Sequence, residues 1–232
     1  MRSRGDVLVL GATGTIGRAV CACLLRRGVG VVGTCNSHDV GKVDCQGIAY
    51  FKGNLLLRRE RERLFMYLKR RNSDLIGLVD CLPCGVRTCE PRLCKWTEAQ
   101  VSIIEELVCR MKMRGGGAVV VMSSTASRLP FVTGHSRFYA GEKGYLESYV
   151  RAASGEFAPE VRINGIAPGI VSVKTGRHYI HKRIAVSSIP LRRFVKPDEV
   201  ASMASFLLLD AASMTGQIVT IDGGLTSSLP LG

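Results

Sequence analysis

The sequence predicts an α/β fold in which helices cover both faces of a doubly wound parallel sheet. The first observation behind this prediction is that short apolar runs alternate with amphipathic helical patterns along the chain. The second is a glycine-spaced loop between the first apolar run and the first helical pattern. The third is length, because 232 residues with 46% hydrophobic and 22% charged side chains suit one well-buried domain. We therefore expect a single domain over residues 1–232.

Each predicted strand is a run of mostly branched apolar residues, and each predicted helix repeats its apolar residues with a helical period. The expected strands are residues 7–10, 29–33, 48–51, 75–79, 118–122, 161–166 and 217–221. The expected helices lie near residues 15–27, 58–71, 97–113, 138–157 and 197–209. No internal repeat or linker interrupts this order, which is typical of consecutive βαβ units with ligands beyond the carboxyl ends of the strands.

The glycine-spaced loop has the residue types of a dinucleotide phosphate site. Residues 7–20 place a buried strand, a turn with Gly11, Gly14 and Gly17, and a helix start in that order. Gly11 lets the backbone turn sharply, Gly14 leaves room for a pyrophosphate, and Gly17 lets the helix pack closely on the strand. The N–H groups and the dipole at the helix start favour phosphate. We therefore expect a Rossmann-type site that also uses Thr13, Thr15 and Ile16.

The end of the second predicted strand favours NADP(H) over NAD(H). An acidic residue there would bind the ribose hydroxyls and repel a 2′-phosphate. The chain has no acid at this point before Asp39. Thr34, Asn36 and Ser37 can instead donate hydrogen bonds to a phosphate, and Arg18 is a candidate cation nearby.

A hydroxyl, a phenol and an ammonium form the candidate catalytic group. Residues 118–122 are a predicted buried strand that runs into Ser123 and Ser124. Tyr139 and Lys143 follow on a predicted helix, where positions i and i+4 share one face. An ammonium near a phenol favours the phenolate and typically lowers the pKa of the phenol by about 1–3. The pair is therefore suited to exchange a proton with a substrate oxygen.

Three further stretches complete a set of six motifs in a fixed order. They are Asn-x-Ile-Ala-Pro-Gly at 164–169, Pro-Leu-x-Arg-Phe at 190–194 and Thr-Gly-Gln-x-x-x-x-Asp-Gly-Gly at 215–224. Together with the glycine loop, the two serines and the Tyr139–Lys143 pair, they resemble the short-chain dehydrogenase/reductase family. The resemblance extends over about residues 7–224 and is to the 3-oxoacyl-(acyl carrier protein) reductase-like branch in particular.

The resemblance implies an NADPH-dependent oxidoreductase that reduces a ketone, either a 3-oxoacyl thioester or a polyketide-type carbonyl, to an alcohol. It implies Tyr139 as the general acid, Lys143 as the residue that lowers its pKa and holds the ribose, and Ser124 as the ligand of the substrate carbonyl. It further implies a mobile lid at about residues 170–187 and a homo-oligomer, either a dimer or a tetramer. The remaining implied cofactor-binding residues are Asn36, Ser37, Asn54, Leu55, Pro168, Gly169 and Val171.

Departures from the family pattern leave alternatives open. The family's Asn-Asn-Ala-Gly is replaced by Asp-Cys-Leu-Pro at 80–83, and its third-strand Asp is replaced by Asn54. The interval from Ser124 to Tyr139 is longer than usual in the family, which leaves Ser123 as an alternative substrate ligand.

The family's catalytic Asn has no counterpart, because no Asn lies between Asn72 and Asn164. Water, Gln100 or Ser102 would have to replace its proton relay, or the relay is lost. Altered or non-redox chemistry is therefore one alternative, and an NADP-binding protein without turnover is another. The Tyr139–Lys143 pair argues against the second, which has no need of it.

The formal charge of +13 points to an anionic partner. The densest cationic run, at 58–71, shares a predicted helix with the apolar stripe Leu57, Leu64, Tyr67 and Leu68, so we expect a solvated face. No aromatic residues alternate with the cations, so nucleic acid is not an expected partner. Cations near the expected cleft would attract a phosphate or carboxylate handle, on acyl carrier protein or coenzyme A; a generally basic surface is the alternative. These cations are Arg128, Arg137, Lys174, Arg177, Lys182, Arg183, Arg192, Arg193 and Lys196.

No apolar run reaches membrane-spanning length, and the first residues lack the apolar core of a signal peptide, so we expect a cytoplasmic location and no membrane partner. The cysteine content is consistent with this location, because nine is an odd number and the chain is not a small secreted scaffold, which favours reduced thiols over a disulfide framework. His178 and His181 lack a matching carboxylate pair for zinc. We expect a thiol-lined pocket or a plain loop without metal at Cys81, Cys84, Cys89 and Cys94.

Overall fold

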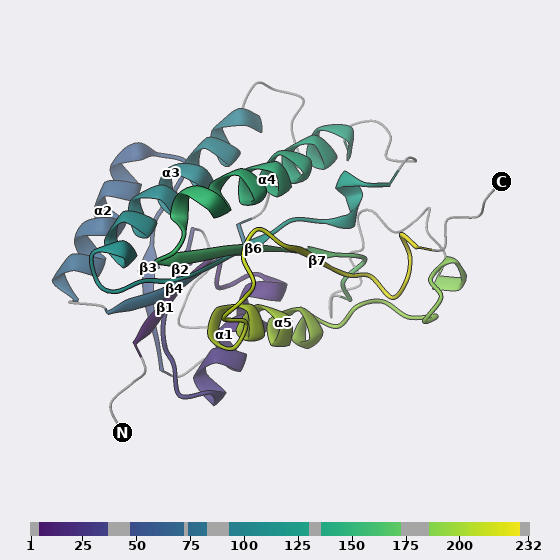
Figure 1. Cartoon of the computed structure of the whole chain (residues 1–232), viewed down its shortest axis with the longest axis horizontal. Helices are drawn as coiled ribbons and strands as arrows, with labels where there is room; N and C mark the ends of the chain where they lie inside the picture. The colour runs from purple at the N-terminus through teal and green to yellow at the C-terminus, as the bar shows by residue number, and fades with distance from the viewer. Residues whose placement is uncertain are drawn as a thin grey trace.

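In the described part of the chain, seven parallel strands form one sheet with helices on both faces (Figure 1). The computed structural model describes residues 5–36, 47–71, 74–82, 93–129, 136–172 and 186–227, apart from the side chains of Leu93, Cys94 and Ser136. The strands are β1 (Asp6–Leu10), β2 (Gly30–Cys35), β3 (Ile48–Lys52), β4 (Leu75–Asp80), β5 (Gly117–Met122), β6 (Val161–Pro168) and β7 (Ile218–Ile221). The helices are α1 (Thr15–Arg26), α2 (Arg58–Arg70), α3 (Leu93–Lys112), α4 (Ser136–Phe157) and α5 (Pro197–Leu209), with 3-10 turns η2 (Thr125–Ser127) and η4 (Val186–Ser188). The strand order β3-β2-β1-β4-β5-β6-β7 confirms the predicted doubly wound, Rossmann-type fold.

The sheet is buried on both faces because successive side chains of each strand point to opposite sides. In β1, Leu8 and Leu10 pack into the core that includes side chains of α2, α3 and α4. Val7 and Val9 pack into the core that includes side chains of α1 and α5. Figure 1 shows these two helical layers on either side of the sheet. None of the helices in the described part of the chain is long and apolar enough to span a membrane.

The largest difference between predicted and observed elements is at the start of α3. The sequence pattern predicted a helix from about residue 97, whereas α3 begins at Leu93. The side chain of Trp96 packs against the same core as Ile103 and Leu107, so the apolar face of the helix extends into this first turn. This extension brings Trp96 to the site described below.

Helix α2 carries its charges on its solvent side, as predicted. Leu64 and Leu68 are buried, but Leu57 is exposed, contrary to its prediction as part of the buried stripe. Leu57 precedes the first helical residue as the N-cap, so the helix does not hold it on the buried face. The ion pair between Arg58 and Glu62 is exposed at 3.0 Å, and such pairs contribute little to stability.

The turn that follows β7 packs against the turn that follows β6. Asp222 accepts hydrogen bonds from the N–H groups of Gly224 (2.9 Å) and Thr226 (2.8 Å). Burial opposes the ionised carboxylate, but these bonds and that from the Thr226 hydroxyl outweigh it and hold the pKa of Asp222 below its usual value. A Cβ atom at Gly169 would lie 2.8 Å from the Asp222 Cβ atom. Glycine is therefore required at 169 by close packing.

Candidate functional site

A cleft of about 570 Å³, here called the main cleft, opens at the carboxyl ends of the central strands. Strand order reverses between β1 and β4, and ligands bind at this point in doubly wound sheets. Of the predicted site residues, the cleft brings together Gly11, Thr13, Gly14, Thr15, Ile16, Gly17, Asn36, Asn54, Leu55, Tyr139 and Lys143. The other described residues that line it are Thr34, Cys35, Gly53, Cys81, Leu82, Trp96, Met122 and Ser123.

The glycine loop has a backbone that fits a dinucleotide pyrophosphate. Gly11 has a φ of +69°, in the left-handed region that favours glycine. A Cβ atom at Gly17 would overlap the carbonyl oxygen of Gly11, so α1 can begin this close to β1 only with glycine at 17. Gly14 caps α1 without a side-chain hydrogen bond, and the first turn holds no acidic residue. The N–H groups and the positive end of the dipole of α1 are therefore available to an anion in the cleft.

Thr34 has a different role from the predicted one. It is 1% exposed, and its hydroxyl oxygen accepts a hydrogen bond from the N–H of Gly11 at 3.1 Å. It holds the glycine loop against β2 and is too buried to present a donor to a phosphate. Arg18 is exposed on α1 and is not one of the described residues that line the main cleft.

The end of β2 retains a polar and a positively charged group near the main cleft. Asn36 lines the cleft, whereas Ser37 lies outside the described residues. Lys52 of β3 is the register partner of Cys35. Burial raises the pKa of the Cys35 thiol, and the charge of Lys52 opposes that rise. The Lys52 ammonium is therefore close enough to the end of β2 to favour a negative charge there. Asn54 lines the cleft and accepts the N–H of Leu56 at 3.2 Å.

Tyr139 and Lys143 lie on the same face of α4. The Lys143 Nζ atom is 5.8 Å from the centroid of the Tyr139 ring and donates a 2.6 Å hydrogen bond to the carbonyl of Met122. Lys143 is buried, whereas Tyr139 is partly exposed. Tyr139 lines both the main cleft and a second cavity, so the phenol stands where the two meet.

The second cavity, here called the side chamber, has a volume of about 290 Å³. Of the predicted site residues, Ser124, Pro168, Gly169 and Val171 line the side chamber, together with Thr15, Ile16 and Tyr139, which line the main cleft as well. The other described residues that line it are Ser123, Thr125, Ala126, Leu129, Ile170 and Leu225. No charged side chain occurs in the described part of this wall. Most of the predicted lid, residues 173–185, lies outside the described residues, so the lid remains a prediction.

The geometry favours Ser124 over Ser123 as the ligand of a substrate. Ser123 is buried, and its Oγ atom lies 2.9 Å from Glu147 Oε1 and 3.1 Å from the carbonyl oxygen of Lys143, which use its one proton. The Oγ atom of Ser124 accepts the N–H of Ala126 at 3.2 Å. Its own proton therefore remains for a ligand in the side chamber.

Neither candidate replacement for the family's catalytic Asn lines the main cleft. Gln100 is fully buried, and its Nε2 atom donates a 2.8 Å hydrogen bond to Asp80 Oδ2. Ser102 lines an outer groove between α3 and α4. From α3, Trp96 lines the main cleft. Burial raises the pKa of Asp80, although a backbone N–H, the charge of Lys143 and the Gln100 amide act in the opposite direction.

Some residues of the main cleft were not predicted from the sequence. Trp96 is the only Trp in the chain, and extending the helical pattern to residue 93 would have placed it at the cleft. Cys81, by contrast, belongs to the segment predicted to form a thiol-lined pocket or a plain loop, and it lines the cleft. Burial raises the pKa of its thiol well above the usual value, which disfavours the reactive thiolate.

Most of the residues that were considered for metal binding lie outside the described part of the chain. Cys84, Cys89, His178 and His181 lie outside the described residues, as does the side chain of Cys94. Within the described part of the chain, no group of three His, Cys, Asp or Glu side chains could hold a metal ion. The absence of metal therefore stays a prediction.

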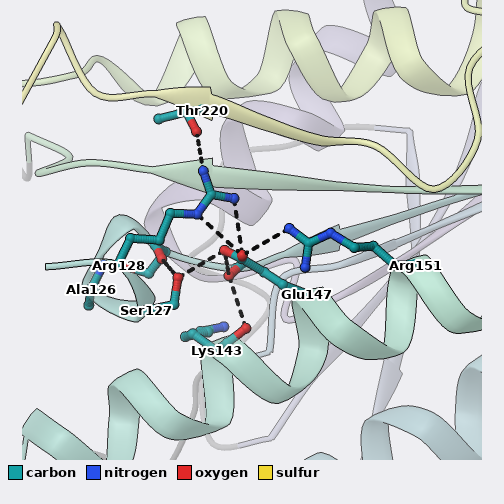
Figure 2. A network of polar contacts seen from close by, with 9 residues as sticks. Ala126, Ser127, Arg128, Lys143, Glu147, Arg151 and Thr220 are labelled. Atoms are coloured by element: carbon teal, nitrogen blue, oxygen red, sulfur yellow. Dashed lines mark hydrogen bonds and ion pairs between the residues drawn. The ribbon is translucent and has the colours of Figure 1, made fainter. Parts of the chain in front are cut away.

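Two of the cations predicted to attract an anionic handle are held by carboxylates. The Arg128 Nη2 atom lies 3.0 Å from Glu147 Oε2, and its Nη1 atom donates a 2.9 Å hydrogen bond to the hydroxyl of Thr220 (Figure 2). Arg193 forms a 2.7 Å ion pair with Glu199. The predicted cations Lys174, Arg177, Lys182 and Arg183 lie outside the described residues.

Comparison with known proteins identifies the family. A sequence profile described as enoyl-(acyl carrier protein) reductase matches residues 99–226, which is more than half of the chain. The chain belongs to the short-chain dehydrogenase/reductase family. This is a family of oxidoreductases that act on CH–OH groups with nicotinamide cofactors.

Individual short-chain dehydrogenases/reductases are similar to the chain over different spans. A tropinone reductase homolog of Arabidopsis thaliana is 28% identical over 95% of this chain and 90% of its own length. An uncharacterized oxidoreductase of Mycobacterium tuberculosis is 38% identical, but over 49% of this chain and 46% of its own length. Other plant homologs also match over about half of this chain and less than half of their own length.

Solved structures show the same fold at low identity. A short-chain type dehydrogenase/reductase from Mycobacterium ulcerans has a TM-score of 0.86 and 24% identity, and the match covers 97% of this chain and 91% of that chain. A structure of a single-residue variant of ElxO with NADPH bound has a TM-score of 0.82 and 21% identity, and the match covers 96% of this chain and 99% of that chain.

Proposed function

We propose that the chain is an NADP(H)-dependent reductase that converts a ketone to an alcohol. The observation that carries this proposal is the position of Tyr139 between the main cleft and the side chamber. Lys143 lies beside it in the main cleft, and Ser124 lies in the wall of the side chamber. A dinucleotide in the main cleft would meet a small carbonyl compound in the side chamber next to this phenol.

Each part of the site would have a distinct role in the reduction. The glycine loop, Asn54 and Lys143 would hold a nicotinamide cofactor, which would supply a hydride when bound. Tyr139 donates its hydroxyl proton to the substrate oxygen, which becomes the oxygen of the alcohol. Lys143 stabilises the phenolate that remains, because its ammonium is 5.8 Å from the ring centroid in a buried site. Ser124 donates a hydrogen bond to the same substrate oxygen and holds it near Tyr139.

The charge at the end of β2 supports NADP(H) as the cofactor. Cys35 and Asn36 stand where an acid would repel a 2′-phosphate, and Lys52 supplies a positive charge to the same end of the strand. ElxO, with the same fold, binds NADPH.

The side chamber supports a neutral ketone as the substrate, because its described wall is apolar apart from hydroxyl groups. The net charge of +13 supports a second candidate, a 3-oxoacyl thioester carried by an acidic acyl carrier protein or by coenzyme A. Arg128 contributes little to that candidate, since it forms an ion pair with Glu147 and a hydrogen bond with Thr220.

Replacing Tyr139 tests the proposal. Tyr139→Phe should lower turnover of a ketone with NADPH by at least about 100-fold, because acid catalysis typically contributes that much. NADPH affinity, measured by fluorescence titration, should stay nearly unchanged, because only the proton donor is lost. Lys143→Ala should reduce both turnover and affinity.

The outcomes separate the alternatives. Full ketone turnover by Tyr139→Phe would show that the mechanism is wrong. A wild-type chain that binds NADPH but reduces no ketone or thioester would instead be a cofactor-binding protein without this chemistry, or one with altered chemistry.

A further inference from the structure

Glu147 lies on the same face of α4 as Tyr139 and Lys143, one helical turn beyond Lys143. Tyr139, Lys143 and Glu147 are spaced four residues apart, so they lie along one face of the helix. The Glu147 side chain is only 6% exposed. A buried carboxylate is costly unless it is paired and hydrogen-bonded, so the contacts of this one explain its presence.

Four side chains surround the Glu147 carboxylate (Figure 2). Its Oε1 atom lies 2.9 Å from the hydroxyl oxygens of both Ser123 and Ser127. Its Oε2 atom lies 3.0 Å from Arg128 Nη2 and 3.6 Å from Arg151 Nη2. A carboxylate offers about four acceptor positions, so these contacts satisfy it.

Three of these contacts reach the segment that carries Ser124. Ser123 precedes Ser124, and Ser127 and Arg128 follow it through the turn η2. The Ser127 hydroxyl oxygen lies 2.8 Å from the carbonyl oxygen of Ser124, so its proton is shared between that carbonyl and the Glu147 carboxylate. Arg128 also donates to Thr220 of β7 and so joins η2 to the edge of the sheet. The carboxylate therefore holds the residues before and after Ser124 against α4.

We propose that Glu147 is a positioning residue, which fixes Ser124 relative to Tyr139 by holding the segment 123–128 against α4. The proposal rests on the proposed function, in which Ser124 and Tyr139 contact the same substrate oxygen. Tyr139 and Glu147 belong to one rigid helix, so a loop fastened at Glu147 has a defined position with respect to the phenol. Small displacements of catalytic groups cost large factors in rate.

Glu147→Gln keeps the size and one oxygen acceptor but replaces the charge that faces Arg128 with an amide. We expect kcat for ketone reduction to fall by about 10- to 100-fold. NADPH affinity should change much less, because the glycine loop is not part of the network and Lys143 contacts it through its backbone carbonyl. Hydrogen exchange of the N–H groups of Ala126, Ser127 and Arg128 should become faster. Ser127→Ala should lower kcat in the same direction, and adding it to Glu147→Gln should cost less than the sum of the two effects.

Glu156→Gln is the matched control, since it makes the same change at an exposed position of the same helix. It should alter neither kcat nor exchange in 123–128. A fall in melting temperature for Glu147→Gln with unchanged kcat and exchange would overturn the proposal, and so would a lower kcat without faster exchange. If the wild-type chain reduces no carbonyl compound, the proposed function fails, and slow exchange of 126–128 that becomes fast in Glu147→Gln would still establish that Glu147 holds the loop.

Discussion

At the scale of single residues, Asp80 has a buried carboxylate whose hydrogen bonds do not offset the cost of burying its charge. Its Oδ1 atom accepts the N–H of Leu82 at 3.0 Å, and its Oδ2 atom accepts from Gln100. Burial nevertheless dominates and raises the pKa of Asp80. The Oε1 atom of Gln100 is also buried and has no hydrogen-bond partner in the described part of the chain. An amide at position 80 would still accept the N–H of Leu82 and would remove the buried charge, whereas the Gln100 side chain would keep one unpaired polar group.

Asp80→Asn should therefore stabilise the chain near neutral pH by about 1–3 kcal/mol, the usual cost of a poorly satisfied buried polar group. The pKa of Asp80 is higher in the folded chain than in the unfolded chain, so ionising it costs more in the folded state. This penalty is absent below the unfolded pKa of about 3.9 and grows as pH rises through the folded pKa. Thermal unfolding of both proteins from pH 4 to pH 8 measures it. The advantage of Asp80→Asn should shrink toward pH 4, and an advantage that does not change with pH would contradict this explanation.

Single residues were also where sequence reasoning was least complete. It placed Ser124, Tyr139 and Lys143 in one region, because strand ends and helical spacing are visible in the sequence. It could not decide between Ser123 and Ser124, because that depends on the contact of Ser123 with Glu147. It misassigned Thr34 for a similar reason, since the partner of that hydroxyl lies 23 residues away in the chain.

At the scale of elements, the alternation of apolar runs and helical patterns was enough to predict a doubly wound parallel sheet and its two helical layers. Parallel strands buried on both faces have a strong apolar signal, so their bounds were nearly correct. The start of α3 was not predicted, because Trp96 extends the helix past the point where a regular apolar repeat is evident. The lid at about residues 170–187 stays a prediction, because residues 173–185 lie outside the described part of the chain.

The adjacent ends of β2 and β3 lead to a prediction about cofactor choice. NADPH should bind more tightly than NADH, because Asn36 and Lys52 lie where a 2′-phosphate is expected. Asn36→Asp should weaken NADPH binding by about tenfold, or roughly 1.4 kcal/mol, and leave NADH binding unchanged or stronger. Fluorescence titration of both cofactors measures the ratio.

Asn36→Ser is the control, because it removes the amide without adding a negative charge, and it should change the ratio much less. Equal affinities of the wild-type chain for the two cofactors would show that this end of the sheet does not select a phosphate.

At the scale of the whole molecule, the layer formed by α3 and α4 has an outer face that suits another copy of the chain. A groove of about 670 Å³ runs between these helices. Two of its aromatic side chains, Phe138 and Tyr145, are more than half exposed. Glu98 and Glu105 on α3 and Arg137 on α4 give the groove charges of both signs. In a twofold dimer the same face meets itself, so an axis that crosses between α3 and α4 can place an acidic group of one copy near Arg137 of the other.

We therefore propose that the chain forms a homo-oligomer through this face, and Tyr145 tests the proposal. Sedimentation velocity over a range of concentrations should show a dimer or tetramer for the wild type. Tyr145→Ser should raise the dissociation constant by roughly 30-fold or more, the effect expected for a buried aromatic anchor worth at least about 2 kcal/mol. Phe206→Ser is the matched control, because Phe206 is 43% exposed on α5, in the opposite helical layer. A monomeric wild type, or equal weakening by both substitutions, would show that α3 and α4 do not form the interface.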